Sequence, residues 1–156
     1  MSDMDKRDDP EFFRLLAGSY RRLLGRDLTP AGLDAREAAR WLYDAAPFVV
    51  LAHDAAADPV FVYGNRAAQR RFGYSWEELT RMPSRLSAET PERAERQRFL
   101  EEVTRAGFVA DYRGIRIAKN GQRFWIEGAT IWQLIDEQGV RHGQAALVPR
   151  TADIAS

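Results

Sequence analysis

The chain contains no cysteine among its 156 residues. Disulfide bonds, thiolate nucleophiles and thiolate metal ligands are therefore excluded. An excess of charge of either sign is also missing, since Lys and Arg together number 23 and Asp and Glu together number 23. A balanced surface gives no indication of a nucleic-acid or anionic membrane partner, and we expect neither.

Long apolar runs are absent too. No stretch approaches the roughly 18 apolar residues that a membrane-spanning helix needs. The N-terminus is charged and lacks the apolar core of a signal peptide, so we predict a disordered segment over residues 1–9. Together these absences predict a soluble, cytoplasmic protein.

Signatures of catalysis are missing as well. The sequence has no Gly-x-Ser-x-Gly elbow, no His-Glu-x-x-His and no glycine loop that could cradle a phosphate. Its two histidines, His53 and His142, lie at the ends of predicted strands, where we expect structural or solvent-exposed roles. Asp54 and Asp58 flank an alanine turn, and their spacing favours turn chemistry over a bound metal. We therefore expect no enzymatic activity and no metal site.

What the sequence does contain is the composition of one soluble globular domain, with 45% hydrophobic and 29% charged residues. Two amphipathic helices are predicted first, over residues 10–45. Asp9-Pro10 and Thr29-Pro30 each combine an N-cap with proline at the first helical position, and Gly25 ends the first helix. Such short helices are not stable alone, so each needs a surface to lie on.

Two short strands and two short helices are predicted next. Residues 48–52 and 61–63 form apolar runs, which indicate buried strands. Asn65 opens a helix, and Gly73 ends it. A Ser-x-x-Glu capping box at Ser75 then starts the second short helix.

The second half of the chain predicts one long helix and three strands. The helix extends from Thr90-Pro91 to Gly107 and turns four apolar residues inward: Phe99, Leu100, Val103 and Ala106. The strands are predicted at about residues 108–117, 123–135 and 142–148. In the middle strand, the even-numbered residues from Phe124 to Leu134 should share one face. Both faces are mostly apolar, so we expect the N-terminal helices, or a second subunit, to cover the face that the other helices leave bare.

Several motifs occur in an order that resembles a known family. One set of residues resembles the signature of PAS sensory domains: Asn65, Ala68, Phe72, Gly73-Tyr74-Ser75 and Glu77-Glu78-Leu79. The narrower MEKHLA family is resembled by residues 83–89, 112–117, 121–126, 131–136 and 143–146. That family is a PAS-like domain found as a free-standing bacterial protein and at the C-terminus of plant class III homeodomain-leucine zipper proteins.

The resemblance implies an α+β fold: a PAS-like five-stranded antiparallel sheet with flanking helices and a two-helix N-terminal extension. The expected organisation is a disordered N-terminus at 1–9, the extension at 10–45, the PAS-like MEKHLA domain at 46–149 and a C-terminal tail at 150–156. The resemblance also implies a sensory or regulatory module that binds a small molecule in the cleft between the sheet and helices. No output domain follows, so we expect signalling through a separate effector protein.

Ten residues are candidates for binding that small molecule: Tyr63, Asn65, Phe72, Met82, Arg85, Phe99, Tyr112, Arg116, Trp132 and Gln144. Aromatic rings and amides are what an isoalloxazine would use, so a noncovalent flavin is one candidate ligand. A covalent flavin adduct of the light-oxygen-voltage type is excluded because it needs a cysteine. Nothing supports haem, since residues 86–107 contain no histidine. Alternatively, the aromatic members fill the core and Asn65 caps a helix.

Two arginines, Arg85 and Arg116, lie in otherwise apolar surroundings in the sequence. An arginine drawn into an apolar cleft needs an anion, because an unpaired buried charge is too costly. One alternative is an internal ion pair, such as Arg116 with Glu127 or Asp111. The other is the carboxylate or phosphate of a ligand, which would then be an aromatic or acyl carboxylate or a flavin-like molecule.

A function of a different class also stays open, namely a ligand-free dimerisation or protein-interaction module. The apolar stripe from Phe12 to Leu24 is suited to a homodimer formed through the N-terminal helices and the sheet face. The sequence identifies neither the ligand nor the effector protein.

Overall fold

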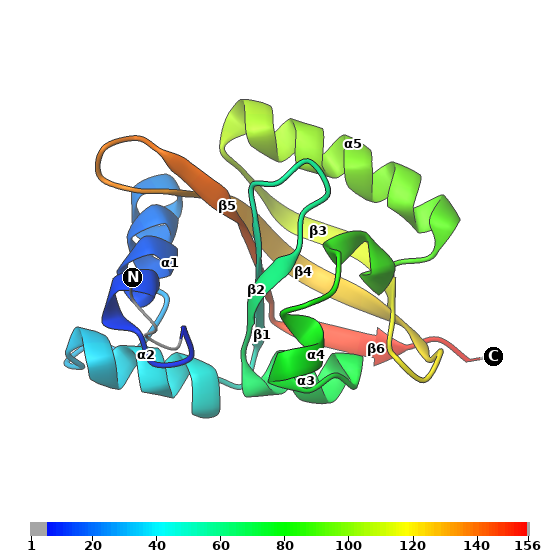
Figure 1. The fold of residues 1–156 in the computed structure, drawn as a ribbon, viewed down its shortest axis with the longest axis horizontal. Helices are drawn as coiled ribbons and strands as arrows, with labels where there is room; N and C mark the ends of the chain where they lie inside the picture. Colours follow the sequence, from blue (N-terminus) through cyan, green and yellow to red (C-terminus); the bar gives the residue numbers. More distant parts are fainter. Residues whose placement is uncertain (1–5, 156) are drawn as a thin grey trace.

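The computed structural model describes residues 6–155, without the side chains at positions 90–93, 96 and 100. Its centre is an antiparallel sheet in which five strands follow the order β2-β1-β5-β4-β3, and a sixth strand, β6, pairs with β4 (Figure 1). The strands are β1 (Val49–Asp54), β2 (Phe61–Gly64), β3 (Phe108–Ile117), β4 (Arg123–Ile135), β5 (Arg141–Val148) and β6 (Arg150–Asp153). The predicted α+β class and five-stranded sheet are confirmed, and β6 replaces part of the expected tail.

The first helix, α1 (Pro10–Leu24), has both of the boundaries that the sequence predicts. The Asp9 side chain accepts a hydrogen bond from a first-turn amide, and Gly25 ends the helix with a φ of 70°. Residues 1–5 lie outside the described part, but residues 6–8 form a turn that leads into the cap. The prediction of disorder is therefore wrong for residues 6–9.

The second helix, α2 (Ala35–Asp44), begins later than predicted. Thr29-Pro30 does not start it, although these residues have the pattern of a cap. Instead the Asp34 side chain accepts from the amide of Glu37, whose own side chain accepts from the amide of Asp34. This reciprocal capping box satisfies two backbone donors at once. Thr29-Pro30 is instead followed by Gly32, whose φ of 89° lies in the left-handed region and does not continue a right-handed helix.

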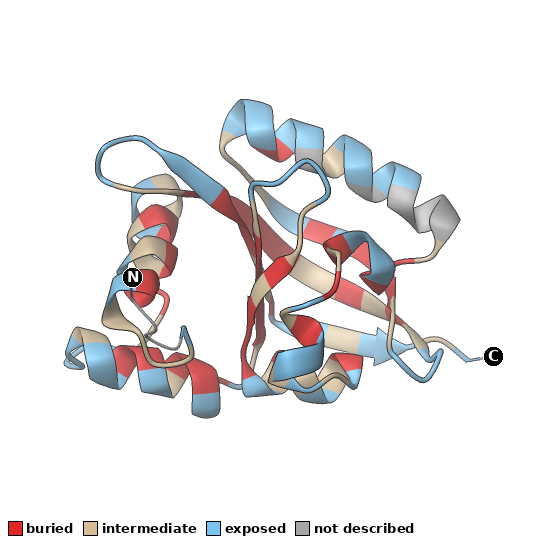
Figure 2. Cartoon of the chain, in the orientation of Figure 1, coloured by how far each residue is buried: buried red, intermediate tan, exposed pale blue. Residues whose placement is uncertain are grey.

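The two N-terminal helices cover one face of the sheet, here called the outer face. A single apolar cluster contains Phe12, Phe13, Leu16, Tyr20, Ala38, Ala39, Leu42, Val50, Ala52, Tyr63, Trp132, Leu134 and Ala145. Figure 2 shows buried residues of α1 and α2 alternating with intermediate and exposed ones along each helix. The expectation that these helices cover the second face of the sheet is confirmed, and their apolar stripe is buried within the same chain.

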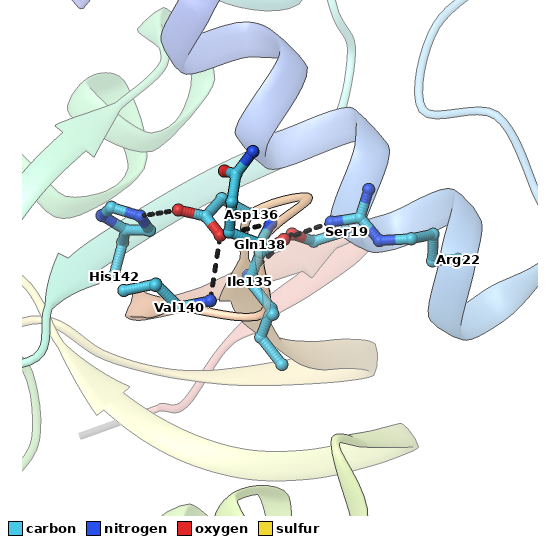
Figure 3. Close-up of polar contacts among 7 residues, drawn as sticks. All are labelled: Ser19, Arg22, Ile135, Asp136, Gln138, Val140 and His142. Atoms are coloured by element: carbon cyan, nitrogen blue, oxygen red, sulfur yellow. Dashed lines mark hydrogen bonds and ion pairs between the residues drawn. The ribbon is translucent and has the colours of Figure 1, made fainter.

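Polar contacts fix α1 at the hairpin between β4 and β5 (Figure 3). The Ser19 hydroxyl donates to the carbonyl of Ile135 at 2.9 Å and accepts from the amide of Ile135 at 2.9 Å. Arg22 donates to the same carbonyl oxygen. Both polar groups of a strand end are thus satisfied by a helix more than a hundred residues away in the chain.

The opposite, inner face carries the remaining helices: α3 (Arg66–Phe72), α4 (Trp76–Leu79), the short 3₁₀ helix η1 (Ser84–Ser87) and α5 (Thr90–Ala106). Their apolar cluster includes Leu51, Phe61, Phe72, Leu79, Met82, Val103, Phe124, Ile126, Ala129 and Ile131. The inner and outer clusters share no residue. The sheet therefore separates two cores.

Gly128 changes which residues of β4 face which core. It has a φ of 66°, in the left-handed region that favours glycine. Before it, Phe124 and Ile126 face the inner core, whereas after it Trp132 and Leu134 face the outer one. The prediction that the even-numbered residues share one face is therefore wrong, because an irregular residue shifts the period-two alternation by one position.

Helix α5 is tied to the inner face by one glutamine of β4. Gln133 donates from Nε2 to the carbonyl oxygens of Val103 at 2.9 Å and Thr104 at 2.8 Å. Val103 is buried and Phe99 half-buried, as predicted, but Ala106 is exposed. The predicted inward position of Leu100 lies outside the described side chains. Gly107 ends the helix as expected.

Candidate ligand-binding cavity

A small cavity lies between the inner face of the sheet and helices α3, η1 and α5. Its volume is about 60 Å³. The apolar wall consists of Leu51, Ala52, Phe61, Phe72, Phe99, Ile126, Ile131, Ala145, Ala146 and Val148. Four polar residues complete it: His53, Ser87, Arg116 and Gln144. A volume of this size admits roughly four to six water-sized groups.

Arg116 brings a cation into this apolar wall. The residue is only 6% exposed, and its Nη1 donates to the carbonyl oxygen of Ile115 at 2.8 Å. Its guanidinium carbon lies 5.7 Å from the centre of the Tyr112 ring. Within residues 6–155, as far as their side chains are described, no carboxylate lies within ion-pair distance of it. The positive charge is therefore balanced by no described acidic side chain.

The internal partner expected for Arg116 is taken by another residue. Glu127 accepts from Nε of Arg113 at 3.1 Å, and the Arg113 guanidinium stacks 3.5 Å from the centre of the Trp125 ring. The predicted ion pair of Arg116 with Glu127 or Asp111 is wrong. Side chains alternate along a strand, so Arg113 and Glu127 lie on the outer side, whereas Arg116 points inward.

Gln144 supplies a second polar group at the other end of the cavity. It is 2% exposed, and its Nε2 has no hydrogen-bond partner within the described part of the chain. Its cross-strand neighbours are His53 on β1 and Gln133 on β4. An amide donor that is buried without a partner costs roughly 1–3 kcal/mol, so an acceptor at this position would stabilise the protein.

A wider groove adjoins the cavity on the solvent side and is here called the outer groove. It lies beside η1 and α5, on the inner-face side of the sheet, and 'outer' refers only to its opening toward solvent. Its volume is about 520 Å³, and His53 and Gln144 line it as well as the cavity. The other residues along it are Ala56, Ala57, Asp58, Pro59, Ser84, Arg85, Gln97, Glu101, Thr104 and Arg141. Arg85 donates from Nε to Asp58 at 3.1 Å and is half-exposed. Arg85 thus lies at the entrance and does not reach the buried cavity.

Four of the ten candidate residues from the sequence line the cavity, and the other six lie elsewhere. Phe72, Phe99, Arg116 and Gln144 line the cavity. Arg85 lines the outer groove, and Met82 and Tyr112 belong to the inner core without lining the cavity. Tyr63 and Trp132 lie in the outer core, on the far side of the sheet. There Tyr63 packs against Phe12, Tyr43 and Trp76, and Trp132 donates from Nε1 to the carbonyl of Leu16 at 3.2 Å.

Asn65 has a structural position. It is fully buried, and its Oδ1 accepts from the amides of Val50 at 3.1 Å and Ala68 at 3.0 Å. Its Nδ2 donates to the carbonyls of Leu42 at 3.1 Å and Phe48 at 3.0 Å. All of its hydrogen-bonding capacity joins α2, β1 and α3, which leaves none for a ligand.

Sequence reasoning missed several residues of the cavity, notably His53, Phe61, Ser87, Ile126 and Ile131. Phe61 lies in a predicted strand, so its burial was indicated but its face was not. Ile126 and Ile131 meet in one wall only because Gly128 shifts the alternation between them. No local pattern in the sequence marks this shift reliably.

The residues present do not fit a flavin or a metal. The cavity of about 60 Å³ is far smaller than the roughly 300–1,000 Å³ that encloses a drug-sized ligand. Among the described residues, no group of three or more His, Asp or Glu side chains could hold a metal ion.

None of the helices within the described residues is long and apolar enough to cross a membrane.

Comparison with family models decides the classification. The model of the MEKHLA domain matches residues 10–152, which include both N-terminal helices and most of β6. The chain belongs to the MEKHLA domain family. No curated protein matches the chain significantly.

Solved structures show that this MEKHLA domain has the PAS/LOV fold. The PAS domain of a protein from Colwellia psychrerythraea has 18% identity and a TM-score of 0.58, with 72% of this chain and 90% of that chain covered. A light-oxygen-voltage domain of a histidine kinase from Erythrobacter litoralis EL346 has 18% identity and a TM-score of 0.57, with 71% and 99% covered. The light-state dimer of the fungal photoreceptor Vivid has 19% identity and a TM-score of 0.60, with 89% and 92% covered.

Proposed function

We propose that this MEKHLA domain is a non-catalytic sensory module of the cytoplasm. It binds a small organic carboxylate in the inner cavity and signals through a separate effector protein. The observation that carries the proposal is Arg116, a buried guanidinium in an apolar wall with no described carboxylate beside it. Leaving such a charge unbalanced is costly, and a ligand anion removes that cost.

The rest of the cavity favours a carboxylate with a short apolar body. Arginine recognises carboxylates through two parallel hydrogen bonds, and the aliphatic and aromatic walls suit a hydrocarbon chain. The volume limits the enclosed part to roughly four to six non-hydrogen atoms. Acyl carboxylates therefore fit better than the flavin-like molecules that the residue types alone would allow.

Native mass spectrometry of the purified full chain, compared with its denatured spectrum, tests the proposal. A retained small mass, without a flavin or haem band in the visible absorbance, is the expected result. If the protein is purified empty, short-chain carboxylates should raise its melting temperature, because a ligand at a hundred times its Kd adds about 2.7 kcal/mol of stability. A bare polypeptide that no carboxylate stabilises contradicts the proposal.

The alternative, a ligand-free dimerisation module, is favoured by one observation on the outer face. Trp125 and its cross-strand neighbour Ile115 are half-buried and belong to neither apolar cluster. They form the part of the outer face available for a homodimer, since the stripe of α1 is already buried. Analytical ultracentrifugation of the wild type and Trp125→Glu separates the two functions. A dimer that this change dissociates supports the alternative, and a monomeric wild type contradicts it.

A further inference from the structure

The cavity around Arg116 and the outer groove share two walls, the side chains of His53 and Gln144. These two residues are direct cross-strand neighbours on β1 and β5. They form the boundary between the apolar cavity of about 60 Å³ and the wider outer groove of about 520 Å³. A ligand longer than the inner cavity can therefore continue into the outer groove only past these two residues.

The two polar groups of the cavity lie near its opposite ends. Arg116 pairs across the strands with Phe124, near the start of β4, whereas Gln144 pairs with Gln133, near its end. Between them the wall is made by apolar residues of β4, Ile126 and Ile131. A carboxylate at the guanidinium thus places a hydrocarbon chain along the apolar wall and the far end of that chain at Gln144.

The groups around that far end select its chemistry. Nε2 of Gln144 is a donor that is buried without a partner among the residues that the structure describes, and it needs an acceptor. The outer groove beyond it offers polar side chains beside apolar ones, with Ser84, Gln97, Thr104 and Arg141 among its lining residues. An apolar methyl terminus would leave the donor unsatisfied. A hydroxyl, carbonyl or carboxylate oxygen would satisfy it.

We propose that the ligand is an aliphatic carboxylate with a hydrogen-bond acceptor at its far end, bound by Arg116 in the inner cavity and by Gln144 at the boundary with the outer groove. This inference rests on the proposed function and names the ligand class more narrowly. It assigns Gln144 the role of distinguishing a polar terminus from an apolar one. Such discrimination is strong when a buried polar group would otherwise lose its partner.

The test is a comparison of dissociation constants for matched probes on the full chain. Propionate, butyrate and pentanoate, which are close to the size that the inner cavity encloses, are titrated beside their ω-hydroxy derivatives and the corresponding dioates. At the best length, the ω-hydroxy acid or the dioate should bind roughly fivefold to tenfold tighter than the plain alkanoate, as expected for one satisfied hydrogen bond. Gln144→Met, which keeps the volume but removes the donor, should abolish this preference and retain alkanoate binding.

Gln138→Met is the matched control, because Gln138 is exposed in the turn between β4 and β5. It should leave both dissociation constants and their ratio unchanged. Equal binding of plain and substituted acids by the wild type overturns the inference but leaves the proposed function standing. This comparison uses only the wild-type protein, so it does not depend on the folding of a variant. An equal loss of both probe classes in Gln144→Met also overturns it. If no carboxylate binds at all, the proposed function fails together with the inference.

Discussion

Glu127 accepts a hydrogen bond from Arg113 at 3.1 Å, and this contact leaves Arg116, on the same strand, without an acidic partner among the described side chains. The two arginines differ by an odd number of positions and therefore lie on opposite sides of the sheet. One is exposed and stacked on Trp125, and the other lines a buried cavity. The proposed ligand site depends on this difference.

Replacing Arg116 by methionine tests whether its charge is unbalanced in the ligand-free protein. A buried charge without a partner destabilises the fold, so Arg116→Met should leave the melting temperature unchanged or raise it. Differential scanning calorimetry of the ligand-free protein measures this. If an internal carboxylate held Arg116 after all, the variant would lose about 3–5 kcal/mol instead.

Asn65 shows how far local sequence patterns reach. Its role as the cap of α3 was predicted, because Asn before a helical segment and Gly73 after it are local signals. Its bonds to Val50, Leu42 and Phe48 were not, since they depend on where two other elements pack. Sequence patterns thus predicted most element boundaries. The start of α2 was predicted wrongly, because Thr29-Pro30 and Asp34 both have the pattern of a cap and the local sequence does not decide between them.

The site was only half predictable for the same kind of reason. Arg116 and Gln144 could be selected by residue type and strand position, and both line the cavity. Trp132 could not be assigned to its correct face, because the conformation of Gly128 is a property of the folded strand. Strand β6 was missed since its pairing with β4 is a long-range contact. Such contacts leave little trace in a single sequence.

Removing the Asn65 side chain should destabilise the protein strongly. Asn65→Ala loses a helix cap, worth about 1 kcal/mol, and leaves buried backbone groups unsatisfied at about 1–3 kcal/mol each. We expect a loss of roughly 3 kcal/mol or more in urea denaturation. Asn120→Ala, in an exposed turn where Oδ1 accepts from the amide of Gln122, should cost less than about 1 kcal/mol. Similar losses in both variants would contradict the bridging role of Asn65.

Two buried tyrosines should respond in opposite ways to loss of the hydroxyl. Tyr63 is 2% exposed and its hydroxyl has no partner in the described part of the chain, so Tyr63→Phe should be neutral or stabilising. The Tyr43 hydroxyl accepts from Gln69 at 2.8 Å, so Tyr43→Phe should cost about 1 kcal/mol. Thermal unfolding of both variants at neutral pH provides the measurement. The reverse order of stabilities would contradict this assignment.

The environment of Tyr63 also predicts how the stability of the fold changes at alkaline pH. Burial, with a smaller contribution from Tyr43, raises the pKa of Tyr63 well above its ordinary value of 10.0. The folded state therefore keeps the proton longer than the unfolded state, so the associated stability is present below pH 10 and falls as the pH rises above it. Tyr63→Phe should show a smaller loss of stability than the wild type above that pH. Identical alkaline profiles would contradict the pKa shift.

The environment of Asp136, at the end of the hairpin that contacts α1, predicts how the stability of the fold changes at acid pH (Figure 3). Hydrogen bonds from His142, Val140 and Gln138 lower the pKa of Asp136 below its ordinary value of 3.8. The associated stability is present above pH 3.8 and disappears as the pH falls through the lower, folded-state pKa. Asp136→Asn should therefore flatten the acid limb of the stability profile. The exposed neighbour Glu137, changed to Gln, is the control and should leave that limb unchanged.

The most direct test of the ligand site is calorimetric titration of propionate and butyrate into the wild type, Arg116→Met and Arg40→Gln. Arg40 is exposed on α2 and controls for the general loss of a positive charge. We predict equal dissociation constants for the wild type and Arg40→Gln, and binding weaker by on the order of a hundredfold in Arg116→Met. Undiminished binding in Arg116→Met, or none in the wild type, would contradict a carboxylate site at Arg116.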